Sequence, residues 1–175
     1  MVVDETRLAL MLARDELHAL VTAYCRAVDR ADYAALRELY HPEATDAHGE
    51  FSAGGVEQFI TQLQAAQPYV RVSQHNITTT NFEIDGEAAR GEIYCLVFHT
   101  FAGPEHDIDV LIGGRYLDEY TRHDDRWKFH RRTIVADWAY QNDPSLVNFS
   151  HPSTRGTRRG QPGQDDPSVG LFTRT

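Results

Sequence analysis

The sequence is poor in several residue types, and each shortage excludes a class of chemistry. Among the 17 basic residues only Lys128 is a lysine, and it lies in the strand-like segment WKFHRR, where we expect an exposed side chain. Schiff-base catalysis needs a desolvated lysine, so the sequence argues against it. Cys25 and Cys95 are the only cysteines, and they form neither a CxxC motif nor a Cys/His cluster. This arrangement indicates two reduced thiols rather than a disulfide framework or a structural zinc site.

Long apolar runs are also missing. Arg14, Glu16 and Arg26 interrupt the N-terminal helical pattern, and no segment approaches the roughly 20 apolar residues that span a bilayer. Asp4 and Glu5 lie where a secretory signal would carry basic residues. The formal net charge of −9 repels phosphate backbones and anionic membranes. We therefore expect a cytoplasmic protein that binds neither nucleic acid nor membranes.

Familiar cofactor motifs are absent as well. The nine histidines include no HxH or HExxH spacing, which is the pattern that brings two imidazoles to one metal ion. No GxGxxG, Walker or GxSxG motif occurs, so nucleotide cofactors and serine-hydrolase chemistry have no support. The sequence predicts acid and base chemistry by side chains, with no metal and no cofactor.

The first part of the chain has helical periodicity. Apolar residues recur at spacings of three and four over residues 6–29, and Asp32 is a suitable N-cap for a second helix that ends near Pro42. A small strand pair is expected within residues 44–51. A third helix follows from Val56, after a pair of glycines.

Beyond Val70 the pattern changes to four long segments rich in β-branched and aromatic residues, joined by turn-forming residues. They predict an antiparallel meander, and the Gly113-Gly114 pair predicts a bulge that curls the sheet. Helices followed by a meander form an α+β fold, in which a curved antiparallel sheet wrapped by N-terminal helices makes a cone. We assign this domain to residues 1–143.

Residues 144–175 differ in composition, with four of the seven prolines and a net positive charge, whereas residues 1–143 carry 13 basic and 24 acidic residues. We expect an irregular tail that docks on the pocket or on a neighbouring subunit. Outward residues of the sheet, for which Val110, Ile112 and Tyr116 are candidates, would bury its outer face in a homodimer or homotrimer.

Two residues are the strongest candidates for catalysis. His75 lies in a strand among Ser, Gln, Asn and Thr residues, where a structural core would prefer Val or Ile. Asp29 ends an apolar helix, and a carboxylate is disfavoured at the negative end of a helix dipole, so a compensating partner such as an imidazole is expected. A carboxylate can fix the tautomer of an imidazole that acts as a general base.

The sequence also resembles a known family over about residues 8–140. AYCRAVDRADYAALRELYHPEA, a histidine in the first long strand, and LIGGRYLDEYTRHDDRWKFHRRTIVADW together are similar to the SnoaL-like branch of the nuclear transport factor 2-like superfamily. That branch includes dehydratases and a dehydrochlorinase. The resemblance implies a cone-shaped α+β fold, cofactor-free lyase chemistry and frequent dimers or trimers.

The resemblance also implies roles for individual residues. Asp29 and His75 match the catalytic His–Asp dyad of the family. Tyr24 falls where the dehydratases have a tyrosine that acts on a leaving oxygen, and Arg132 matches an arginine that holds an anionic or electronegative group. His99 lies near a second polar residue of the dehydratase pockets.

Two points of geometry stay open at the level of sequence. Tyr24 and Asp29 are five residues apart, about 140° around a regular helix, so both face one pocket only if the helix end loosens. Arg132 shares strand parity with His130, so it points inward alone only if a bulge shifts the phase; otherwise Arg131 is the inward residue.

The favoured interpretation is a lyase or isomerase that acts on a small hydrophobic, cyclic substrate by proton abstraction. Trp138, Phe98 and Phe129 are candidate lining residues of the cavity. The alternative is a non-catalytic module of the same fold that binds a small molecule or a partner. A third interpretation, epoxide hydrolysis, needs an Asp–Arg–Asp arrangement, for which Arg132 and Asp137 are available.

Overall fold

The helices and strands follow the order that the sequence predicts. The computed structural model describes residues 4–169 and 171. Three α-helices come first, interrupted by two short strands, and a 3₁₀ turn leads into four long strands. The bounds are α1 Glu5–Asp29, α2 Tyr33–Glu38, β1 Tyr40–Ala47, β2 Ala53–Gly55, α3 Val56–Ala66, η1 Gln67–Tyr69, β3 Val70–Asp85, β4 Ala88–Phe101, β5 Ile108–His123 and β6 Arg126–Asn142.

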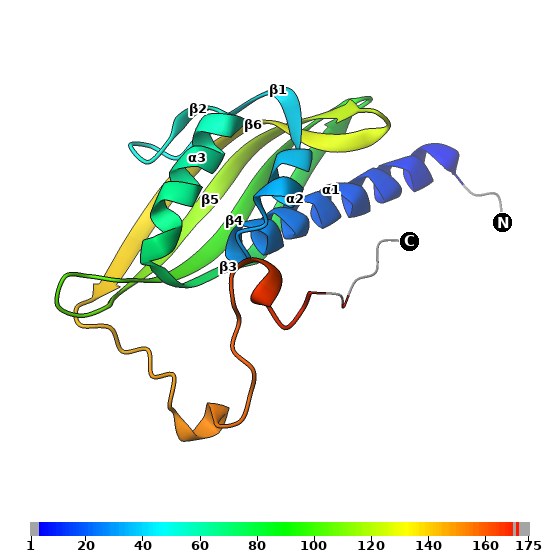
Figure 1. The fold of residues 1–175 in the computed structure, drawn as a ribbon. Coiled ribbons are helices and arrows are strands. Elements are labelled where there is room, and N and C mark those ends of the chain that lie inside the picture. Colours follow the sequence, from blue (N-terminus) through cyan, green and yellow to red (C-terminus); the bar gives the residue numbers. More distant parts are fainter. Residues whose placement is uncertain (1–3, 170, 172–175) are drawn as a thin grey trace.

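The six strands form one curved sheet in the order β2-β1-β6-β5-β4-β3. The four long strands are an antiparallel meander, as predicted, and β1 joins it in parallel to β6. The three α-helices lie against one face of this sheet (Figure 1). The predicted α+β cone fold is therefore confirmed. Within the described residues, no helix is long and apolar enough to cross a membrane.

Local signals place most element boundaries. The Asp32 side chain accepts a hydrogen bond from the Ala35 amide and caps α2, as its position predicts. The helix stops at Glu38, earlier than expected, and Pro42 lies inside β1 instead. The predicted small strand pair also exists but is shifted: β1 pairs with β2 from Thr45 to Ala47.

Two bulges shape the sheet. One falls at Gly113 and Gly114, where the pairing of β5 with β6 shifts register. A Cβ atom on Gly114 would lie 2.4 Å from the carbonyl oxygen of Val135, a distance that only glycine permits. The second bulge is on β6, where Tyr120 pairs with Phe129 but Glu119 pairs with Arg131. The extra residue, His130, reverses the inward parity of the residues after it.

The interior of the cone is filled by large side chains from the helices and from the inner face of the sheet. Its residues with at most 1% exposure are Leu17, Val21, Tyr24, Leu36, Phe59, Ile60, Ile93, Tyr120, Phe129 and Arg132, together with the polar Asp46. Close packing of this kind leaves the space for a ligand at the open end of the cone, where α1 ends and β3 begins.

Candidate active site

A histidine and a carboxylate meet at the open end of the cone. The Nδ1 atom of His75 lies 2.6 Å from Oδ1 of Asp29. The same carboxylate accepts hydrogen bonds from the Ser73 hydroxyl at 2.9 Å and from the His75 amide at 2.9 Å. The imidazole is 8% exposed and the carboxylate 10% exposed. The other ring nitrogen of His75, Nε2, has no hydrogen-bond partner within residues 4–169 and 171.

The ends of two elements create this contact. Helix α1 stops at Asp29: the Arg30 amide bonds to two carbonyls of the last turn, and Ala31 has a positive φ of 52°. Strand β3 is the last strand of the sheet, so the outward amide of His75 has no neighbouring strand and binds Asp29 instead. Burial raises the pKa of Asp29, but the hydrogen bonds from His75 and Ser73 outweigh burial, and the net pKa is lowered.

His99 and Tyr24 are aromatic neighbours of the His75 ring. The ring centroid of His99 is 5.5 Å from that of His75, and that of Tyr24 is 6.4 Å away, edge-on. Burial and the neighbouring His75 lower the pKa of His99 to about 4, so its imidazole is neutral at neutral pH. Its Nδ1 atom is buried and has no hydrogen-bond partner in the described part of the chain.

Tyr24 belongs to the core behind the histidine. It is 1% exposed, and burial raises the pKa of its hydroxyl well above the ordinary value. Because α1 ends directly after Asp29, both Tyr24 and Asp29 reach His75. Tyr24 does not line the pocket beside Asp29, and its action on a leaving oxygen stays a prediction.

Arg132 is the inward arginine, and Arg131 is exposed. The bulge at His130 in β6 shifts the strand parity, so Arg132 points inward and Arg131 points outward. The guanidinium of Arg132 makes two hydrogen bonds to Asp118, at 2.8 and 2.6 Å. It lies 4.1 to 4.2 Å from the ring centroids of Tyr24, Tyr116 and Phe129. Arg132 is therefore held in the core, although its Nη1 atom has no hydrogen-bond partner in the described residues. It does not line the pocket beside Asp29.

Two predicted lining residues are on the wrong face of the sheet. Strand β4 alternates regularly opposite β5, with Ile93, Cys95 and Val97 buried in the core, so Phe98 faces outward. Trp138 pairs with Gly113 and packs over it on the outer face, where it is 49% exposed. Phe129 does face inward, but it is a fully buried core residue rather than part of a cavity wall.

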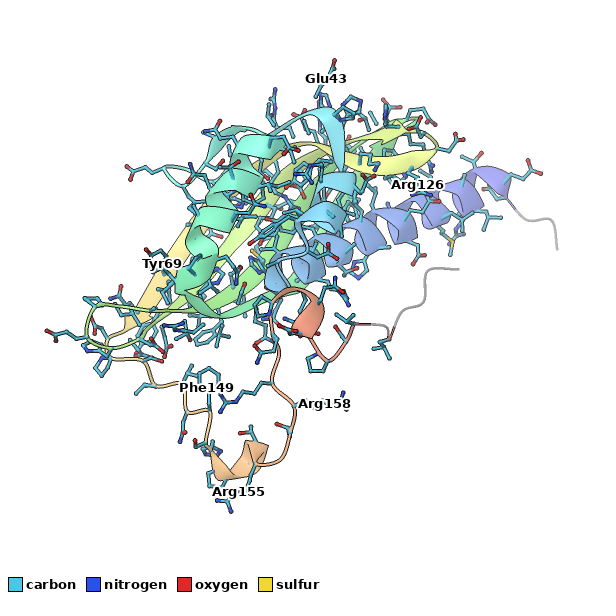
Figure 2. The ribbon with its side chains drawn as sticks, viewed as in Figure 1. Glu43, Tyr69, Arg126, Phe149, Arg155 and Arg158 are labelled. Atoms are coloured by element: carbon cyan, nitrogen blue, oxygen red, sulfur yellow. The ribbon has the colours of Figure 1, made fainter. Side chains whose placement is uncertain are left out.

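A pocket of about 750 Å³ adjoins the Asp29 side of the His75–Asp29 pair, and neither His75 nor His99 is among its lining residues. Its inner wall includes Asp29, Ser73 and Gln74, and its outer wall is the C-terminal tail over residues 148–162. The tail leaves the end of β6, loops away from the body and returns to the end of α1 (Figures 1 and 2). We refer to residues 147–159 as the tail loop.

Two buried carboxylates hold the two ends of the tail loop. Asp109, which is 3% exposed, accepts hydrogen bonds from the Ser145 hydroxyl and the Leu146 amide. At the other end, Asp166 pairs with Arg30 at 3.1 Å. Hydrogen bonds from Ser168 and from a backbone amide lower the pKa of Asp166 to about 2. The loop is thus fixed at both ends.

Comparison with known proteins identifies the family. The SnoaL-like domain matches residues 9–133, which include both members of the His75–Asp29 pair. The chain belongs to the SnoaL-like family. No curated protein matches it.

Several solved structures share the fold. A putative scytalone dehydratase from Novosphingobium aromaticivorans DSM 12444 has 17% sequence identity and a TM-score of 0.68, covering 83% of this chain and 94% of its own. A type 2 hexachlorocyclohexane dehydrochlorinase has 20% identity and a TM-score of 0.72, covering 86% and 99%. The type 3 enzyme from Novosphingobium barchaimii LL02 has 20% identity and a TM-score of 0.71, covering 86% and 100%.

Sequence reasoning missed three contributions to this SnoaL-like site. Ser73 is two residues before His75 and therefore on the same face of β3, a signal that strand parity provides. Asp118 and Asp166 gave no such signal, because their partners are distant in the chain. The family match ends at residue 133, so the tail that covers the pocket lies outside the matched region.

Replacing Asp166 by asparagine should release the tail loop. The variant Asp166→Asn loses the ion pair with Arg30 and weakens several charge-assisted hydrogen bonds, each worth about 1.5–3 kcal/mol. We expect trypsin to cleave after Arg155, Arg158 or Arg159 several-fold faster than in the wild type, measured by mass spectrometry under native conditions. Asp165→Asn, one residue away, is the matched control. Equal cleavage rates in Asp166→Asn and the wild type would show that Asp166 does not hold the loop.

Proposed function

We propose that this SnoaL-like protein is a cofactor-free lyase or isomerase that removes a proton from carbon in a small hydrophobic, cyclic substrate. The observation that carries the proposal is the 2.6 Å contact of His75 Nδ1 with Asp29, which leaves Nε2 without a partner in the described residues. An imidazole whose one nitrogen is held by a carboxylate has its other nitrogen available as a general base.

The steps follow from these positions. The Nε2 atom of His75 takes a proton from carbon, and Asp29 stabilises the imidazolium that forms. In an elimination, the electron pair of the broken C–H bond forms a C=C bond as the C–O bond of the leaving group breaks. The imidazolium returns its proton to the departing hydroxide, which leaves as water. In an isomerisation, the proton returns to another carbon.

Two neighbours are suited to assist the oxygen atoms of the substrate. His99 is neutral at neutral pH, because its pKa is about 4, and its one N–H is used by a hydrogen bond to the Val72 backbone. Its Nδ1 atom, which has no partner in the described residues, is therefore an acceptor for a hydroxyl group of the substrate. Tyr24 contacts the His75 ring from the core side. The names of the similar structures, a putative scytalone dehydratase and two dehydrochlorinases, agree with elimination chemistry and support the choice of reaction class.

The test is exchange of carbon-bound hydrogen with solvent. The protein is incubated in D₂O with a panel of cyclic β-hydroxy ketones and cyclic enones, and ¹H NMR follows the signals next to the carbonyl group. We expect loss of one C–H signal with at least one panel member, faster than without protein. Binding of panel members without any exchange would instead indicate the alternative, a non-catalytic module that binds small molecules.

The epoxide-hydrolase interpretation has less support. It requires Arg132 between two acidic residues, one of them Asp137. Asp137 is exposed and pairs with Arg115, at 2.8 Å, whereas Arg132 pairs with Asp118 alone. One pair is exposed and the other is fully buried, which argues against a shared Asp–Arg–Asp arrangement.

Self-association stays a prediction. The residues that would form the interface differ from the candidates Val110, Ile112 and Tyr116. Tyr116 is buried and Ile112 packs against the core, and Val110 shares their strand parity, so all three point inward. The outer face of the sheet instead exposes Tyr94, Leu96, Leu117, Trp138 and Tyr140. We expect sedimentation equilibrium to give a dimer or trimer that Trp138→Glu weakens, and a wild type that sediments as a monomer would contradict the prediction.

A further inference from the structure

The pocket beside Asp29 is lined mainly by basic residues, whereas the protein as a whole is acidic. Among the described residues, five arginines line it, Arg30, Arg71, Arg155, Arg158 and Arg159, whereas the only acidic lining residue is Asp29. Asp29 is already committed to His75 and Ser73. The chain as a whole carries a net charge of −9, so this wall is opposite in sign to the rest of the molecule.

At least five arginines elsewhere in the described residues have carboxylate partners. Arg37 pairs with Glu57, and Arg115, Arg122, Arg131 and Arg132 also have acidic partners. Around the pocket, Arg30 pairs with Asp166, and Arg71 lies 3.7 Å from Asp107. In the described part of the chain, Arg155, Arg158 and Arg159 have no ion pair to a carboxylate.

Contacts of the tail loop with the rest of the protein fix the positions of these arginines. Asp109 and Asp166 hold its ends, as described above. Within it, Arg159 donates to the Phe149 carbonyl at 3.1 Å, and its guanidinium lies 4.5 Å from the centre of the Phe149 ring. Figure 2 shows Phe149 on one arm of the loop, Arg158 on the returning arm and Arg155 at the far turn. A basic tail that is simply solvated would not need these contacts. The two buried carboxylates and the Arg159–Phe149 contact hold the loop in one position.

We propose that this pocket binds a phosphate or diphosphate group of the substrate, on the Asp29 side of the His75–Asp29 pair. Three arginines without carboxylate partners exceed the charge of a single carboxylate ligand and match a group with two or more negative charges. Guanidinium groups bind phosphate oxygens in pairs of parallel hydrogen bonds. The link to the reacting carbon rests on the proposed function, whereas binding of the anion does not depend on catalysis.

The substrate then has two parts. An apolar, cyclic part lies toward the His75–Asp29 pair, and a phosphate-bearing part extends toward the tail loop. The net charge of the protein does not oppose this arrangement, because the acidic excess lies in residues 1–143, outside the tail. The arginines screen the approaching anion from that excess at short range.

Calorimetric titration with inorganic pyrophosphate at low ionic strength tests the site. We expect saturable binding that weakens as salt is added, weaker binding of inorganic phosphate, and little binding of acetate. The triple variant Arg155→Gln/Arg158→Gln/Arg159→Gln should bind pyrophosphate at least about tenfold more weakly, since each lost arginine removes charge-assisted hydrogen bonds. Arg126→Gln, an exposed arginine at the far end of β6 (Figure 2), should change the affinity less than twofold.

Two further variants separate the possible failures. His75→Gln should bind pyrophosphate as the wild type does, so a protein that binds the anion but exchanges no C–H bond would contradict the proposed function alone. Asp166→Asn keeps every arginine but releases the loop, and it should bind several-fold more weakly. Absence of saturable binding, or equal affinity in the triple variant, would overturn the phosphate site.

Discussion

Replacing His75 by glutamine is expected to lower kcat by about 10³-fold, within the 10²- to 10⁴-fold contribution usual for a general base. The glutamine side chain still fills the space and is able to donate a hydrogen bond to Asp29, but it does not accept a proton at neutral pH. The melting temperature should therefore change little while turnover falls. The measurement is deuterium exchange or product formation with the first active member of the ketone panel.

The variant Asp29→Asn tests whether Asp29 positions the His75 imidazole for catalysis or only stabilises the fold. Three donors converge on the Asp29 carboxylate, from the Ser73 hydroxyl, the His75 amide and the His75 ring. An asparagine has one acceptor oxygen, so at least one donor loses its partner, which costs about 1–3 kcal/mol of stability. We expect kcat to fall in addition, because the amide no longer selects the His75 tautomer. A variant that loses stability but retains kcat would show that the pair is structural only.

Strand parity determines which side chains of the sheet reach the site and which do not. His75 and Ser73 share one face of β3, and His99 lies on the inner face of β4 with Cys95 and Val97. Phe98 is adjacent to His99, so the two side chains point to opposite faces of a regular strand. Placing both in one pocket contradicted the two-residue period that the sequence itself displays.

Bulges limit what parity predicts. The sequence alone left Arg131 and Arg132 as alternatives, because the outcome depends on whether His130 is an extra residue in β6. The Gly113-Gly114 pair does predict the other bulge, since glycine tolerates the close approach of Val135. No comparable residue marks the bulge at His130, so the choice requires the structure.

The tail shows a different limit. Its prolines, glycines and arginines correctly predict irregular structure, and residues 144–169 contain only two short 3₁₀ turns. Its position over the pocket depends on contacts such as Asp166 with Arg30, which are 136 positions apart in the chain. Local patterns carry no information on such a pairing, because periodicity describes which face of an element is buried and not what distant segment covers it.

Asp118→Asn is expected to destabilise the fold by about 3–5 kcal/mol, the cost of leaving one partner of a buried ion pair uncompensated. Arg132 and Asp118 are both 0% exposed at the side chain, and three aromatic rings surround the guanidinium. Asparagine retains the shape of the carboxylate but not its charge, so the cation stays buried without a counterion. Tyr120 also donates to Asp118, at 2.7 Å, and an amide nitrogen at that point would not accept its proton.

The control for Asp118→Asn is the neighbouring ion pair of the same two strands. Arg131 and Glu119 lie 3.8 Å apart on the outer face and are 61% and 46% exposed, so Glu119→Gln should cost less than about 1 kcal/mol. The double variant Arg132→Met/Asp118→Leu removes both buried charges and should recover most of the loss. Urea unfolding of all three variants measures the difference. If Asp118→Asn and Glu119→Gln cost the same, the buried pair is not a determinant of stability, and Arg132 would be free to serve the substrate.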